Sequence, residues 1–184
     1  MNFPLIFHGP YTEDKYNQFF NPNVCHVCKL HSRDLITCNR CNMISYCSKE
    51  HEAIHRNSHS EICKAIGRVI TDKSFSDIYP SLEKWTESRK GILHQTRSSL
   101  SRGIQRYEME MILCAKSCCV CFRQTNIWHC NICYSAHFCH DDQKLFKVLH
   151  KKYCPRVVAI TEYEYRPYKR LYRRYFSSRR MNQI

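Results

Sequence analysis

Paired cysteines constrain this chain more than any other feature. Fourteen of its 184 residues are Cys, and two CxxC pairs, Cys25 with Cys28 and Cys38 with Cys41, follow each other closely. Small modules that bury too little apolar surface are usually stabilised by disulfides or by metal ions. The apolar run Phe3–Phe7 is short, contains Pro4 and has no basic residue before it, so no secretory leader is expected. We therefore expect an intracellular protein, nuclear or cytoplasmic, whose cysteines bind metal, with no transmembrane segment.

The first cysteine-rich segment contains enough donors for two metal ions. After the two CxxC pairs come a CxxxH and an HxxxC pair, whose spacing places both donors on one face if each pair lies on a helical turn. Two tetrahedral zinc sites need eight donors. Short strands at 35–37 and 44–46 can pair as a hairpin between the CxxC arms. The candidate ligands are Cys25, Cys28, Cys38, Cys41, Cys47, His51, His59 and Cys63.

This pattern, with YCSKEH at Tyr46–His51, resembles the MYND finger, a small cross-braced zinc module. The resemblance implies interleaved ligands, the first ion being held by the first CxxC pair with Cys47 and His51. The second ion would then be held by the second CxxC pair with His59 and Cys63. The resemblance also implies a protein-interaction module. Three further histidines fall outside the ligand register and are interpreted as solvated or as neighbours of the ligands: His26, His31 and His55.

A second copy of the pattern begins about 92 residues later and lacks one ligand. Seven of the eight donors recur: Cys118, Cys121, Cys130, Cys133, Cys139, His150 and Cys154. Gln143 stands where the shift places His51, and glutamine is a poor zinc ligand. Either Asp142 or His140 could complete that site, so the second copy is expected to hold one or two zinc ions in addition to the two of the first. Cys114 and Cys119 are extra and are interpreted as packing residues or unpaired thiols.

The remaining segments predict helices. Between the two copies, apolar residues at mostly helical intervals favour a long amphipathic helix that is broken or bent near Gly91 or Gly103 and packs against the fingers. These residues are Ile78, Leu82, Trp85, Ile92, Leu100, Tyr107 and Met111. After the second copy, a segment with tyrosines on one face and basic residues on the other predicts a helix behind Pro167. Its residues are Tyr168, Lys169, Arg170, Leu171, Tyr172, Arg173, Arg174 and Tyr175.

The predicted fold class is small zinc-stapled α+β modules joined by an α-helical spacer, with little β-sheet beyond short zinc-knuckle hairpins. The predicted segments are an N-terminal extension (1–23), a MYND-type zinc finger (24–64), a helical spacer (65–117), a degenerate MYND-like zinc finger (118–155) and a basic aromatic tail (156–184). This order is similar to that of arthropod MYND-type proteins.

Closed four-ligand sites favour a zinc-binding interaction adapter over an enzyme, because catalytic zinc needs an open coordination position. We therefore expect no catalytic residue and a protein or peptide partner, as in MYND proteins of transcriptional or chromatin regulation. Glu52 and Arg56 replace the glutamine and tryptophan with which the family binds its peptides, which favours an acidic or differently shaped ligand. The alternative is nucleic-acid binding through the tail, because the chain's net charge is +13 and the tail is its most basic part.

Overall fold

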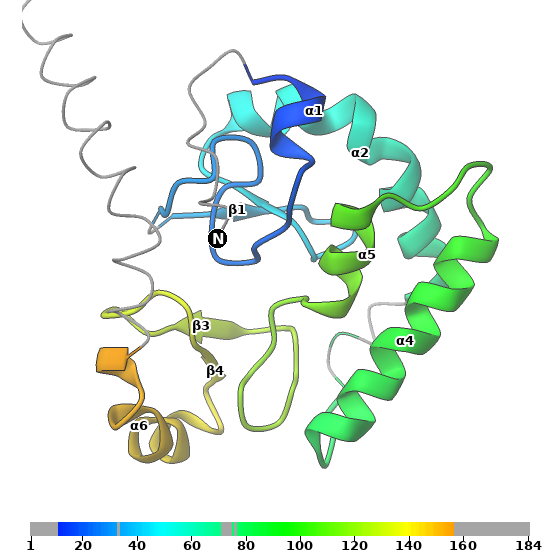
Figure 1. Ribbon diagram of the computed structural model, residues 1–184. Helices are drawn as coiled ribbons and strands as arrows, with labels where there is room; N and C mark the ends of the chain where they lie inside the picture. Colours follow the sequence, from blue (N-terminus) through cyan, green and yellow to red (C-terminus); the bar gives the residue numbers. More distant parts are fainter. Residues whose placement is uncertain (1–10, 33, 71–74, 76, 157–184) are drawn as a thin grey trace, which may run out of the picture.

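The computed structural model describes residues 11–32, 34–70, 75 and 77–156. In its first part, strands β1 (Ile36–Thr37) and β2 (Ser45–Tyr46) form an antiparallel hairpin. Helix α2 (Lys49–Val69) follows, and the short helix α1 (Glu13–Tyr16) lies beside it (Figure 1). The Ser48 side chain accepts a hydrogen bond from the His51 amide and so caps the helix. This cap fixes where α2 starts relative to Cys47.

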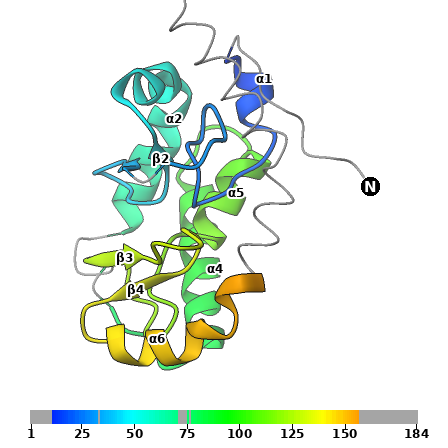
Figure 2. The ribbon, with the colours of Figure 1, turned by 90° about the vertical axis from the view of Figure 1, so that its left-hand side faces the viewer.

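The second part has the same order of elements. Strands β3 (Ile127–His129) and β4 (His137–Cys139) pair antiparallel, and helix α6 (Gln143–Lys151) follows (Figure 2). The register of Trp128 with Phe138 repeats that of Ile36 with Tyr46 at the same 92-residue shift. Two two-stranded sheets are the sheet content of the described part, so the predicted fold class of small α+β modules is confirmed.

The helical segment between the hairpins is broken near Gly103, one of the two positions expected from the sequence. Helix α2 continues past the expected module boundary to Val69, and the described part of the segment also contains α4 (Leu82–Ser98) and α5 (Arg106–Leu113). Gly91 lies inside α4, whereas the turn around Gly103 separates α4 from α5. Arg102 stabilises this turn by ion pairs with Glu61 (2.8 Å) and Glu108 (2.6 Å).

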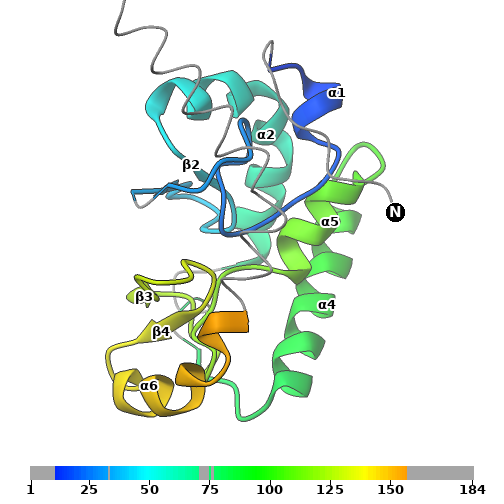
Figure 3. The same ribbon diagram turned by 60° about the vertical axis from the view of Figure 1, so that its left-hand side comes forward.

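These helices belong to the core rather than acting as a free spacer. Met111 and Ile112 of α5 are fully buried against the hairpin and α2. Trp85 of α4 stacks on Phe122 of the second module, with ring centroids 6.0 Å apart. Figure 3 shows the two modules one above the other, with α4 and α5 along one side of both. The Trp and Met stripe therefore packs against the modules as expected.

Two residues of the expected packing stripe are exposed, and the expected C-terminal helix lies outside the described residues. Ile78 and Leu82, which the helical spacing placed on the packing stripe, are 59% and 65% exposed. The basic aromatic helix at 168–175 lies outside the described residues. Within the described residues, none of the helices has the length and apolarity that crossing a membrane requires.

Candidate metal centres

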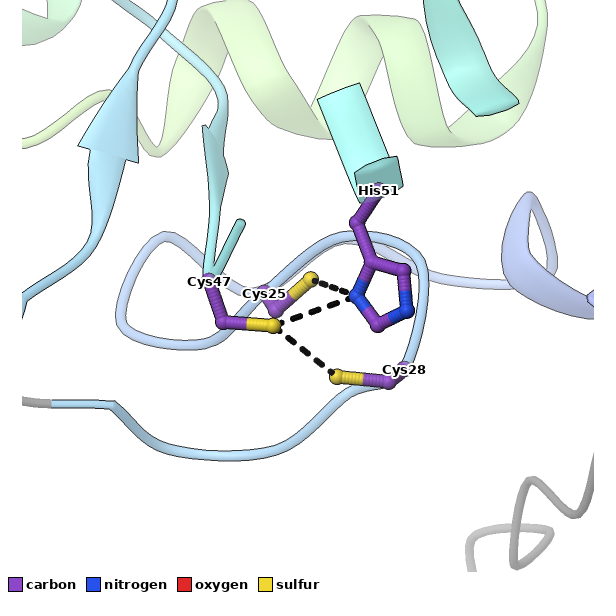
Figure 4. A group of neighbouring side chains, drawn as sticks. All are labelled: Cys25, Cys28, Cys47 and His51. Carbon is purple, nitrogen blue, oxygen red and sulfur yellow. Dashed lines mark hydrogen bonds between the residues drawn. The ribbon is translucent and has the colours of Figure 1, made fainter. Parts of the chain in front are cut away.

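The first cluster joins Cys25, Cys28, Cys47 and His51 (Figure 4). The CxxC pair lies on a tight turn, Cys47 follows β2, and His51 is in the first turn of α2. The His51 Nδ1 atom lies 3.4 Å from the Cys25 Sγ and 3.1 Å from the Cys47 Sγ, and the Cys28 and Cys47 sulfurs are 3.7 Å apart. Four donors thus converge on one point from three separate elements.

The second cluster joins Cys38, Cys41, His59 and Cys63. The CxxC pair turns between β1 and β2, and the other two donors lie one helical turn apart on α2. The Cys38 and Cys63 sulfurs are 3.7 Å apart, and His59 Nε2 lies 3.4 Å from the Cys41 sulfur. The structure therefore groups the eight donors in the interleaved way that the resemblance implied, with α2 supplying donors to both clusters.

These distances fit zinc. Tetrahedral zinc with Zn–S of about 2.3 Å and Zn–N of about 2.0 Å places two sulfurs about 3.8 Å apart and a sulfur and nitrogen about 3.5 Å apart. The observed separations of 3.7 Å and 3.4 Å match both values. All fourteen cysteines, which lie within the described residues, are free of disulfides. The donors of each cluster lie within 4.8 Å of one another, as a shared ion requires.

Two further clusters lie in the second module. One joins Cys130, Cys133, His150 and Cys154, with a Cys130–Cys154 sulfur separation of 3.7 Å and a Cys133 Sγ to His150 Nε2 distance of 3.4 Å. These values repeat those of the second cluster in the first module. The same type of closed Cys3His site is therefore present in both modules.

The fourth cluster is completed by Asp142. Its Oδ2 atom lies 3.2 Å from the Cys118 sulfur and 3.1 Å from the Cys139 sulfur, and the Cys121 and Cys139 sulfurs are 3.7 Å apart. His140 is exposed and contacts the Trp128 ring instead. Of the two alternatives that the sequence left open, the structure places the carboxylate among the thiols, giving a Cys3Asp site.

The position of Asp142 shows why the 92-residue shift pointed to Gln143. Asp142 is eight residues before His150, just as His51 is eight residues before His59. The stretch from Cys139 to Asp142 is one residue shorter than the stretch from Cys47 to His51. The shift between the two copies therefore becomes 91 at this point. Counting back from His150 would have identified the ligand, and Gln143 is the counterpart of Glu52 rather than of His51.

The backbone around the CxxC pairs recurs in both modules. The Cys25 amide bonds to the Leu30 carbonyl as the Cys118 amide does to Arg123, at 3.0 and 2.8 Å. Positive φ angles recur too: Lys29 (56°) corresponds to Phe122 (62°) and Asn42 (53°) to Tyr134 (55°). Such left-handed residues let the turn aim its amides and both sulfurs at one point. Both modules thus hold their CxxC pairs in the same type of zinc knuckle.

A buried lysine lies beside the first cluster and was not identified from the sequence. Lys29 is fully buried, and its Nζ atom donates to the Phe19 carbonyl at 2.8 Å and to His26 Nδ1 at 3.2 Å. Burial lowers the pKa of Lys29 to about 7, and the nearby Cys25 and Cys28 thiolates oppose that shift. A Cys3His zinc site carries a net charge of −1, so the lysine supplies a compensating positive charge.

Two of the three off-register histidines are buried rather than solvated. His26 donates from Nε2 to Asn17 Oδ1 at 3.0 Å, because Nδ1 is occupied by the Lys29 ammonium. His55 stacks on the ligand His59 with ring centroids 5.4 Å apart, and its Nδ1 bonds to the Tyr46 hydroxyl at 2.9 Å. Burial lowers the pKa of both imidazoles, that of His55 to about 3. These residues fix the ligand helix instead of binding metal.

The extra cysteines do not join a metal cluster. Cys114 and Cys119 are exposed, free thiols, and burial of their sulfurs raises the pKa of both. The Cys119 amide bonds to the His137 carbonyl at 2.9 Å, which repeats the bond between His26 and Ser45 in the first module. The unpaired-thiol interpretation therefore applies to both residues.

Comparison with known proteins identifies the first module. The family model described as the MYND finger matches residues 25–63. No match was found among curated proteins or solved structures. The MYND finger is a zinc-binding protein-interaction module, so zinc is the metal for the two clusters within residues 25–63. The second module lies outside the matched residues, and its donor sets are those of zinc by geometry.

Proposed function

We propose that this protein is a zinc-stabilised interaction adapter that performs no catalysis itself. The observation that carries the proposal is that each of the four clusters has four protein donors. A zinc ion in such a cluster has no open position for water or substrate, whereas catalytic zinc needs one. The second module is proposed to be a degenerate repeat of the first, of the arthropod MYND type.

The proposed partner-binding surface is an apolar groove on the second module. It lies between the β3–β4 hairpin and α6, with a volume of about 940 Å³. Trp128 and Ile132 line it although they are 50% and 71% exposed, while Phe138 and Phe146 stack below them with centroids 4.4 Å apart. Exposed apolar residues that line one concave surface are typical of a protein-binding site.

The charge around the groove favours a partner with acidic residues. Lys147 and Lys151 line the groove from α6, and the helix itself contains no acidic side chain. On α2 of the first module, by contrast, Glu52 forms an ion pair with Lys49 (2.8 Å) and Arg56 is exposed. We therefore assign the binding of an apolar segment with acidic flanks to the second module. Transcriptional or chromatin regulators inside the cell are the proposed class of partner.

The test compares two charge substitutions at sites of similar exposure. Ile132→Glu places a carboxylate in the groove. Val148→Glu places a carboxylate on α6 at a residue that does not line the groove and is 74% exposed. Partners recovered with the zinc-loaded protein and identified by mass spectrometry should be lost with Ile132→Glu and kept with Val148→Glu. Equal recovery with both variants, at unchanged zinc content, would place the binding surface elsewhere.

A second candidate function is nucleic-acid binding through the tail. Residues 156–184 contain eight Lys and Arg against two acidic residues, interleaved with tyrosines. If the tail binds RNA or DNA, affinity should fall steeply with added salt, and removal of residues 157–184 should abolish it. Affinity that persists in the truncated protein would exclude the tail as the binding element.

A further inference from the structure

A second, smaller cleft lies between the two hairpins and differs in chemistry from the apolar groove. It has a volume of about 450 Å³ and is lined by residues of both modules, among them Thr37 and Asn42 of the first and His129 and His137 of the second. In Figure 1 the β1–β2 hairpin and the β3–β4 hairpin face each other across this region. Lys116, on the chain that enters the second module, lies in the same cleft.

Within the described part of the chain, Lys116 bonds to a hydroxyl next to the cleft and forms no ion pair with a carboxylate. Its Nζ atom donates to the Ser45 hydroxyl at 2.9 Å, and that hydroxyl also bonds to Thr37 Oγ1 at 3.0 Å. None of the described residues that line the cleft is Asp or Glu. A lysine ammonium that bonds to a hydroxyl can also serve as a point charge for a bound anion.

Other groups in the cleft are also suited to an anion. His129 and His137 line the cleft together with Lys116. Asn126 lines the cleft from an exposed position. Imidazole N–H and amide N–H groups donate hydrogen bonds, and a lysine ammonium serves as a point charge for phosphate.

We propose that this cleft binds an oxyanion, with Lys116 as the charged residue that holds it. The volume exceeds that of a free phosphate ion, so the oxyanion can be free or can be carried by a larger molecule, such as a phosphorylated side chain. Among the described lining residues, the site shares His129 with the apolar groove, and it contains no residue of the four metal clusters.

The test is an NMR titration of the full-length zinc-loaded protein with inorganic phosphate, sulfate, phenyl phosphate and acetate. We expect saturable shifts of cleft resonances with phosphate and sulfate. A carried phosphate predicts tighter binding of phenyl phosphate than of phosphate, a free ion predicts the reverse, and both outcomes support the site. Saturation by acetate alone, or no saturation by any probe, would overturn the proposal.

Variants connect the binding to Lys116. Lys116→Gln should weaken phosphate binding by about tenfold or more, because it removes a charge-assisted hydrogen bond. Lys116→Arg should keep binding, and Lys144→Gln, an exposed lysine on α6, should leave it unchanged. If Lys116→Gln does not fold, Asn126→Asp provides the same test, since it adds a negative charge at an exposed position of the cleft and Asp tolerates the φ of 50°. Unchanged phosphate affinity in both Lys116→Gln and Asn126→Asp would refute the assignment.

Discussion

The carboxylate ligand of the fourth cluster gives the most specific prediction. In Asp142→Ala, Cys118, Cys121 and Cys139 would remain as three thiolate donors, and the Oδ2 atom that lies 3.1–3.2 Å from two of the sulfurs would be gone. Structural zinc sites contribute about 10–16 kcal/mol of binding free energy, so one donor in four is worth about 3 kcal/mol. Because about 1.4 kcal/mol corresponds to a factor of ten, we expect zinc at this site to bind about a hundredfold more weakly.

The assay is competition with a chromophoric chelator, and a neighbouring residue supplies the control. The parent should release zinc from the Cys3Asp site before it releases zinc from the three Cys3His sites. The reason is that the fourth donor of the Cys3Asp site is a carboxylate and not an imidazole. Asp142→Ala should release one ion at about a hundredfold lower chelator concentration, and Gln143→Ala should match the parent. Equal release by Asp142→Ala and the parent would show that Asp142 is not a ligand. Tighter zinc binding in Gln143→His would instead place the ligand at residue 143.

Three further predictions concern the first module. Cys38→Ala should expose residues 25–63 to proteolysis, because it breaks a closed site, and protease resistance equal to that of the parent would contradict a structural role for zinc. Lys29→Met should cost about 2–3 kcal/mol in denaturant unfolding, because it removes the hydrogen bonds that Nζ donates to the Phe19 carbonyl and to His26 Nδ1, and a loss well below 1 kcal/mol would contradict this account. His55 has a folded pKa of about 3 against about 6.5 when unfolded, so the unfolded state gains a proton first and stability falls as the pH drops below about 6.5. Between about pH 6.5 and pH 5, the free energy of unfolding of His55→Phe should therefore fall by about 2 kcal/mol less than that of the parent. Denaturant unfolding at both pH values measures this difference, and equal losses would refute the burial argument.

The sequence was most informative where chemistry restricts the residue type. Zinc accepts few donors, so the spacing of Cys and His located fifteen of the sixteen residues that form the four clusters, and the first hairpin. The remaining ligand was left open between two residues because a deletion of one residue after Cys139 changes the repeat shift, which a single-shift comparison does not detect. Aspartate is also a common surface residue, so its type alone did not mark Asp142 as a ligand.

The helical segment and the buried charges depended on tertiary contacts. Glycine in a helix costs only about 1 kcal/mol relative to alanine, so Gly91 did not end α4, while the polar stretch around Gly103 did separate two helices. Lys29 and His26 have no distinctive sequence spacing. They are buried together because Phe19 and Asn17, which precede the first finger, fold back and supply their hydrogen-bond acceptors.

The measurement that tests the central claim most directly is the zinc content of the intact protein by native mass spectrometry. Four closed clusters predict a mass that corresponds to four zinc ions per chain, and the apo-protein obtained by chelation should lose the far-ultraviolet circular dichroism of both modules. A zinc-loaded protein that holds only two ions, or an apo-protein that keeps its circular dichroism, would contradict the account of two zinc-stabilised modules.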